Sequence, residues 1–223
     1  MVNIAENIKK FQDLVPKDVE IVAVSKFHPA SMILEAYDSG QRNFGESRVQ
    51  EFLQKEKELP SDILWHFIGH LQTNKVKQII GKTHLIESVD SERLLHLIDR
   101  ESEKAGVVTR VLLQVHVADE ETKFGFYPDE LKEFFAKRGF ESLKATHICG
   151  IMGMATNTDD EKKIKEDFQT LHQIFEEIKK DIALGLRGFN TLSMGMSGDW
   201  KLAVEEGSNM VRIGSAIFGQ RIY

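Results

Sequence analysis

Ile21-Val22-Ala23-Val24-Ser25-Lys26-Phe27-His28-Pro29 is a short apolar run that leads into a lysine and then into a proline turn. A run this short and rich in valine and isoleucine indicates a strand buried on both faces, as in a parallel sheet. A lysine at the carboxyl end of such a strand is unusual. Burial destabilises an ammonium and frees an amine that can form a Schiff base with an aldehyde. Alternatively, the ammonium of Lys26 reaches water past the strand end.

The composition is that of an ordinary globular protein, with 223 residues of which 41% are hydrophobic and 29% charged. A formal net charge of −6 argues against nucleic acid or an anionic membrane as a partner. We expect no signal peptide and no membrane helix, because no apolar stretch approaches the roughly 20 residues that a membrane helix needs. Cys149 is the single cysteine, so no internal disulfide is possible. These features predict a cytoplasmic protein.

Predicted strands and helices alternate along the whole chain. Strands are expected near residues 21–25, 42–46, 63–69, 84–89, 110–117, 145–155, 188–194 and 209–214. Helices are expected at 4–15, 30–40, 47–59, 128–138 and 199–206. Further helices are expected in a segment that ends at Gly81, from Asp90 or Ser91 to Gly106, from a Thr158–Glu161 capping box to 178, and in a short segment that begins at 216. Eight such units in one run favour a (β/α)8 TIM barrel over an open sheet. No linker divides the chain, so we expect one domain over residues 1–223 with an extra N-terminal helix.

Unusual residues follow most of the predicted strands, at the end where a barrel carries its active site. They are Lys26, Asn43 to Glu46, Gly69 to Asn74, Glu87-Ser88, Lys123 to Gly125, Met152 to Met154, Ser193 to Met196 and Gly214-Ser215. Together they predict one site at the carboxyl ends of the strands.

Two glycine-containing loops predict a phosphate site within that face. Residues 193–198 follow the seventh strand, and residues 214–216 follow the eighth and open a short helix. Either loop alone could be a tight turn, but barrels often bind phosphate with the loops after these two strands. A Schiff-base lysine beside a phosphate site leaves two options. One is pyridoxal phosphate (PLP), and the other is a sugar-phosphate aldolase in which Lys26 captures the substrate carbonyl.

Several motifs resemble those of the PLP homeostasis protein family, the YggS/PROSC type of PLP-binding protein. The resemblance covers residues 24 to 219 and rests on Val24-Ser25-Lys26, Asn43-Phe44-Gly45-Glu46-Ser47, Trp65 to Lys75, Gly150 to Met154, Leu192 to Trp200 and Val211 to Gly219. It implies a single barrel like that of alanine racemases (PLP fold type III), with PLP bound to Lys26. The cofactor-binding residues that we expect are Lys26, Asn43, His66, Ile68, Met152, Ser193, Met194, Gly195, Arg212, Gly214 and Ser215.

The resemblance also implies individual roles. Ser193, Gly214 and Ser215 would contact the phosphate, Asn43 and Met152 would lie near the ring, and Arg212 would face the pyridine nitrogen. His116 stands where the family often has Asn, which leaves the role of its strand open. Asn209 and Ser215 replace the more common Thr, but Ser215 keeps the hydroxyl.

An arginine at the pyridine nitrogen weakens the ring as an electron sink, because a guanidinium is effectively always protonated. The racemases that this chain resembles in part add a second domain and a tyrosine base. The three tyrosines here, Tyr37, Tyr127 and Tyr223, lie outside the motifs. We therefore predict a PLP carrier, buffer or donor in intracellular vitamin B6 homeostasis, without robust catalysis. A weak amino-acid racemase is the alternative, and a Schiff-base aldolase is a distant one.

The expected partners are PLP and, transiently, apo forms of PLP-dependent enzymes. We expect a monomer and no metal, since the histidines are too scattered for a zinc site. Lys123 lies on the predicted active face and is a hypothetical second acceptor that could take PLP from Lys26.

Overall fold

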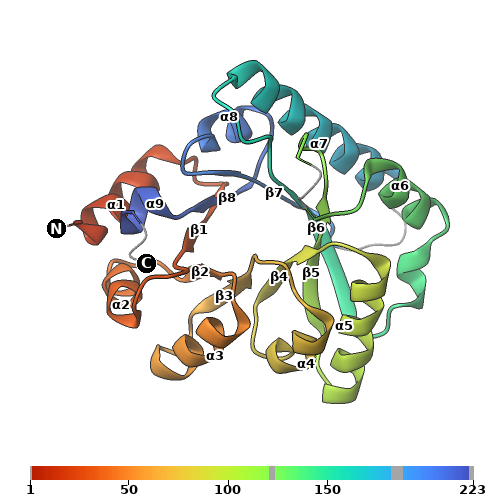
Figure 1. Ribbon diagram of the computed structural model, residues 1–223, viewed down its shortest axis with the longest axis horizontal. Helices are drawn as coiled ribbons and strands as arrows, with labels where there is room; N and C mark the ends of the chain where they lie inside the picture. Colours follow the sequence, from red (N-terminus) through yellow and green to blue (C-terminus); the bar gives the residue numbers. More distant parts are fainter. Residues whose placement is uncertain (1, 121–123, 182–187, 221–223) are drawn as a thin grey trace.

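Eight parallel strands form a closed barrel in the computed structural model of the chain, which describes residues 2–120, 124–181 and 188–220 (Figure 1). Each strand pairs with the next, and the last pairs with the first, where Val22 lies beside Arg212. The predicted (β/α)8 barrel is confirmed. The strands are β1 Glu20–Val24, β2 Asn43–Glu46, β3 Leu64–Phe67, β4 Leu85–Val89, β5 Thr109–Val115, β6 Thr146–Gly153, β7 Thr191–Met196 and β8 Met210–Ile213.

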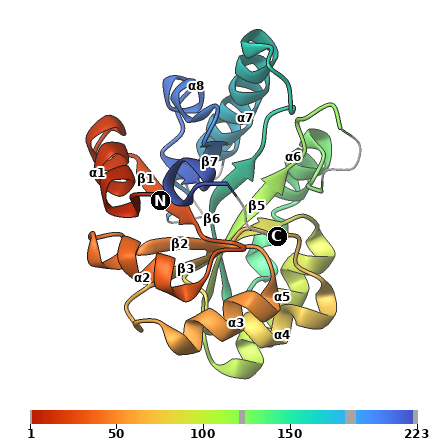
Figure 2. The same cartoon turned by 60° about the vertical axis from the view of Figure 1, so that its left-hand side comes forward.

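Helices surround the strands, with α2 to α5 below the barrel and α6 to α8 above it in the view of Figure 2. They are α1 Ile4–Leu14, α2 Ala30–Asp38, α3 Val49–Glu58, α4 Val76–Ile79, α5 Glu92–Ala105, α6 Pro128–Ala136, α7 Glu161–Asp181, α8 Trp200–Glu205 and α9 Ser215–Phe218, with 3-10 turns η1 Thr73–Lys75 and η2 Gly139–Ser142. None of the described helices is long and apolar enough to cross a membrane.

The predicted extra helix, α1, packs beside the short helix that follows the last strand. Asn7 of α1 donates a hydrogen bond from Nδ2 to the carbonyl of Ile217 in α9 at 2.9 Å. The ring of Phe11 meets that of Trp200 in α8 edge to face, with centroids 5.9 Å apart. Helix α9 is a single turn of four residues, and α1 beside it buries Ile4, Ile8 and Phe11 in the main core.

The start of helix α7 differs from its prediction. The capping box of Thr158 and Glu161 was wrong: Thr158 Oγ1 accepts the N–H of Asp160 at 3.1 Å, and Asp160 Oδ1 accepts that of Lys162 at 3.0 Å. The short Asp160 side chain stands next to the helix and reaches its first turn directly, so α7 begins at Glu161. Of the two predicted caps of α5, Ser91 is the one that caps it.

Charged and apolar side chains share the interior of the barrel. The main apolar core lies between the strands and the surrounding helices. A second, smaller apolar cluster comes from strands alone, namely Val22, Leu85, Leu112, Cys149, Met152 and Met210, with Met154 packed against it. The remaining interior is occupied by Glu87, His66, Ser193 and Arg212, all less than 5% exposed. The barrel therefore places a buried polar network directly beneath the carboxyl ends of its strands.

Candidate functional site

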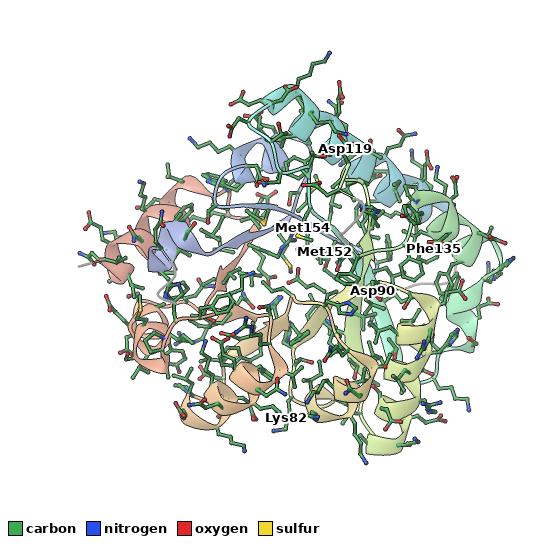
Figure 3. All side chains as sticks on the ribbon, in the orientation of Figure 1. Lys82, Asp90, Asp119, Phe135, Met152 and Met154 are labelled. Atoms are coloured by element: carbon green, nitrogen blue, oxygen red, sulfur yellow. The ribbon has the colours of Figure 1, made fainter. Side chains whose placement is uncertain are left out.

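A cavity of about 240 Å³ opens at the carboxyl ends of β1, β3, β6, β7 and β8. Six of the predicted site residues line it: Lys26, Ile68, Met152, Arg212, Gly214 and Ser215. The lining also includes Met154, Met196, Ser197 and Gly198, which belong to the predicted face and loops but not to the expected cofactor-binding residues. Val24, His28 and Gly219 complete it. Figure 3 shows Met152 and Met154 near the centre of the barrel.

Lys26 stands two residues beyond the end of β1, where it is partly buried at the cavity wall. The Schiff-base lysine that the sequence predicts therefore has access to the cavity. His28, in the same turn, is 4% exposed, and its ring stacks on that of Phe218 with centroids 5.3 Å apart. The sequence could have indicated that His28 lies near the site, because His28 follows Lys26 by two residues.

Arg212 lines the cavity and is held by two hydrogen bonds. Its Nη1 donates to Ser193 Oγ at 2.6 Å, and its Nη2 donates to the carbonyl of Gly153 at 2.9 Å. Ser193 in turn donates from Oγ to Glu87 Oε2, also at 2.6 Å. Burial lowers the pKa of the guanidinium, and the charges of Glu87 and Asp199 oppose that effect. The arginine is therefore oriented by the protein before any ligand enters.

The network continues from Glu87 through His66 toward the opposite end of the barrel. Nδ1 of His66 lies 2.7 Å from Glu87 Oε1, and its Nε2 lies 3.3 Å from Asn43 Oδ1. Full burial raises the pKa of Glu87, but the hydrogen bond and charge of His66, the charge of Arg212 and the Ser193 hydroxyl outweigh it, and the net shift is downward. Glu87 is therefore an ionised counter-charge for Arg212 inside the barrel.

Five predicted residues do not line the cavity. Asn43, His66 and Ser193 belong to the network beneath it. Met194 is fully buried in the main core, and a Cβ on Gly195 would lie 2.5 Å from Cβ of Ala203 in α8. Their predicted contacts with a cofactor stay predictions.

The loop after β7 meets the start of α9 through a single hydroxyl. Ser197 Oγ accepts the N–H of Gly214 at 3.1 Å and that of Ala216 at 3.4 Å. Two backbone donors that converge on one oxygen at the cavity wall match the requirement of a phosphate oxygen. The predicted phosphate loops are thus brought together by Ser197, which lies in the predicted loop 193–198 but was not among the expected cofactor-binding residues.

His116 and Lys123 are two residues whose roles the sequence left open. His116 is almost buried, donates from Nε2 to the carbonyl of Glu120 at 3.0 Å and does not line the cavity. Lys123 lies outside the described residues. Next to it, Phe124 stacks on His70 with ring centroids 3.8 Å apart. In the described part of the chain, no group of three His, Cys, Asp or Glu side chains could hold a metal ion.

Comparisons with known proteins agree on one family. Residues 1–222 match the family model "Alanine racemase, N-terminal domain". The pyridoxal phosphate homeostasis protein of Schizosaccharomyces pombe is 38% identical over 208 residues, which cover 92% of this chain and 85% of that protein. The solved structure of PipY from Synechococcus elongatus PCC7942 with PLP bound is similar with a TM-score of 0.88 and 35% identity, covering 97% of this chain and all of that one. Alanine racemase of Clostridium difficile shares the fold, with a TM-score of 0.80 and 17% identity over 98% of this chain and 56% of that one.

Proposed function

This chain belongs to the family of pyridoxal phosphate homeostasis proteins, and from that membership we propose that it binds PLP as a Schiff base on Lys26. The observation that carries the proposal is that one cavity is lined by Lys26, by Gly214 and by Ser197, whose hydroxyl accepts the N–H groups of Gly214 and Ala216. An aldehyde and a phosphate are the two groups that these residues fit. The PLP-bound PipY structure supports the same cofactor.

The covalent step is a condensation. The amine of Lys26, after losing its proton, adds to the aldehyde carbon, and one water leaves as the carbon–nitrogen double bond forms. Ser215 is exposed at the start of α9 and offers a further hydroxyl at the cavity wall. The hydroxyl of Ser197 must turn or move to let an anion use the donors that it now occupies.

PLP should bind far more tightly than pyridoxal, which carries the aldehyde but no phosphate. We expect Ser215→Ala to weaken PLP binding by about 10- to 100-fold, since a hydrogen bond to a charged group contributes about 1.5–3 kcal/mol. Titrations followed by visible absorbance measure both ligands. The affinity for pyridoxal should not change in the variant, and an equal loss for both ligands would contradict the phosphate assignment.

We further propose that the protein holds PLP rather than turning substrates over. Bound PLP would supply an electron sink for carbanion chemistry, and the guanidinium of Arg212, facing the ring nitrogen, would keep that sink weak. Among the described residues no tyrosine lines the cavity: Tyr37 donates its hydroxyl to Asp62 at 2.7 Å, and Tyr127 is 54% exposed. Tyr223 lies outside the described residues.

Alanine racemisation separates a PLP holder from a weak racemase. The PLP-loaded protein should racemise L-alanine no faster than the same concentration of free PLP does. Chiral chromatography of the amino acid measures the rate, with PLP and the Lys26→Ala variant as the control sample. Sustained turnover that requires Lys26 would contradict the proposal.

The physiological role that we propose is that of a carrier, buffer or donor of PLP in cytoplasmic vitamin B6 homeostasis. The S. pombe relative is named a pyridoxal phosphate homeostasis protein. On this proposal the barrel is one domain that acts as a monomer, and apo forms of PLP-dependent enzymes are its transient partners. A cavity open at one end of the barrel fits a ligand that must enter and leave.

A further inference from the structure

The turn that carries Lys26 contains a strained residue. Phe27, directly after the lysine, has a φ of 67°, in the left-handed region that residues other than glycine seldom occupy. Such a conformation is energetically unfavourable and persists only where the surroundings impose it. Whatever imposes it also fixes the direction in which Lys26 leaves the backbone.

Helix α3 holds the backbone on both sides of the lysine. On one side, Lys55 donates from Nζ to the carbonyl of Ser25 at 2.9 Å. On the other side, the N–H of Phe27 donates to Glu51 Oε1 at 2.6 Å. The guanidinium carbon of Arg48 lies 4.5 Å from the centroid of the Phe27 ring, so the side chain is held as well.

We call the side chains that make these contacts the α3 clamp and define it as Glu46, Arg48, Glu51 and Lys55, of which Lys55 forms ion pairs with Glu46 and Glu51. Nζ of Lys55 lies 2.7 Å from both Glu46 Oε1 and Glu51 Oε1, and with the Ser25 carbonyl it uses all three of its protons. The hydroxyl of Ser25 donates to Glu46 Oε1 at 2.6 Å. Glu51 and Lys55 are spaced i, i+4 on α3, which places them on one helix face, and Arg48 is the N-cap residue just before the helix.

Burying the charged groups of the clamp carries a desolvation cost. Lys55 is 5% exposed and Glu46 is fully buried. Burial raises the pKa of Glu46 despite the charge of Lys55, and within the described part of the chain Glu46 Oε2 has no hydrogen-bond partner. Buried ion pairs often contribute less stability than apolar residues of the same volume. A role in orientation accounts for charges at this place better than stability does.

We propose that the α3 clamp consists of positioning residues that hold the Lys26 turn so that its amine meets the aldehyde of PLP. This inference rests on the proposed function. It predicts that loss of the clamp slows the covalent step and leaves the non-covalent binding of the phosphate and ring unchanged. If the clamp only stabilised the fold, its loss would weaken the covalent step and the non-covalent binding together.

Glu51→Ala tests the inference, because it removes the acceptor of the Phe27 N–H. We expect Schiff-base formation, followed by stopped-flow absorbance after mixing with PLP, to slow at least about tenfold, since misplacing a reacting group by an ångström has effects of that size. Pyridoxine 5′-phosphate carries an alcohol in place of the aldehyde and cannot form the Schiff base. Its dissociation constant, measured by calorimetry, should stay within about twofold of wild type.

Matched variants make the result specific. Glu51→Gln retains an oxygen that can accept the Phe27 N–H and should restore much of the rate. Glu58→Ala, at an exposed carboxylate of the same helix, should not change it. If Glu51→Ala does not fold, Ser25→Ala, which removes the hydrogen bond to Glu46, should show the same separation of rate and binding.

Two outcomes would overturn the inference: an unchanged rate in Glu51→Ala, or an equal loss of pyridoxine 5′-phosphate binding. Failure of the wild-type protein to form a Schiff base with PLP would overturn the proposed function instead.

Discussion

Lys26→Ala should abolish the visible absorption band that PLP gives when it forms a Schiff base with the wild-type protein. The alanine side chain has no amine to condense with the aldehyde, so the expected effect is a complete loss rather than a shift. Absorption spectra of both proteins, recorded after addition of PLP and removal of the free cofactor, measure it. Lys26→Arg should lose the band too, because a guanidinium keeps the positive charge but does not form this linkage.

Lys57→Ala is the matched control for the loss of a lysine. Lys57 is exposed on α3 and does not line the cavity. Its spectrum should equal that of wild type. A band that persists in Lys26→Ala at full intensity would show that another lysine holds PLP.

Gly150→Ala should destabilise the barrel strongly, because there is no room for a side chain at this position. A Cβ on Gly150 would lie 1.8 Å from the carbonyl oxygen of Thr191 on β7, and the φ of 156° is rare for residues with a side chain. The backbone would have to move where β6 pairs with both neighbouring strands. We expect a loss of about 4 kcal/mol or more in the free energy of unfolding, measured by urea denaturation.

Gly198→Ala is the control for this change. No atom lies within 4 Å of a Cβ at that position, and the backbone there is not in the left-handed region. Its free energy of unfolding should stay within about 0.5 kcal/mol of wild type. Equal stability of the two variants would contradict the close packing of β6 against β7.

The alternation of apolar runs with helical segments was enough to predict the barrel. The β1 run of Ile21 to Val24 is apolar throughout because strands of a barrel are covered on both faces, and Val111 to Leu113 of β5 repeat that pattern. The position of Lys26 and of the loops after β7 and β8 follows from the same logic, since parallel strands end on one face.

The polar interior of the barrel could not be predicted in detail. The chain from Arg212 through Ser193 to Glu87 joins three strands and depends on their register, which the sequence does not specify. The hydrogen bond between Ser197 and Gly214 also depends on the register of β7 and β8, so the sequence did not specify it.

The α3 clamp was not visible in the sequence either. Lys55 and Glu51 belong to a helix with so many charged residues that the sequence predicts a solvent-exposed surface. Lys55 is buried only because α3 packs against the turn after β1. The left-handed conformation of Phe27 had no signal, because no glycine or asparagine marks the position.

Peptide mapping by mass spectrometry, after borohydride reduction of the PLP-loaded protein, tests the central claim most directly. Reduction turns the Schiff base into a stable secondary amine, so the modified lysine keeps its label through proteolysis. The account predicts the pyridoxyl phosphate label on Lys26 at close to one per chain. A wild-type protein labelled mainly on another lysine, or not labelled at all, would contradict it.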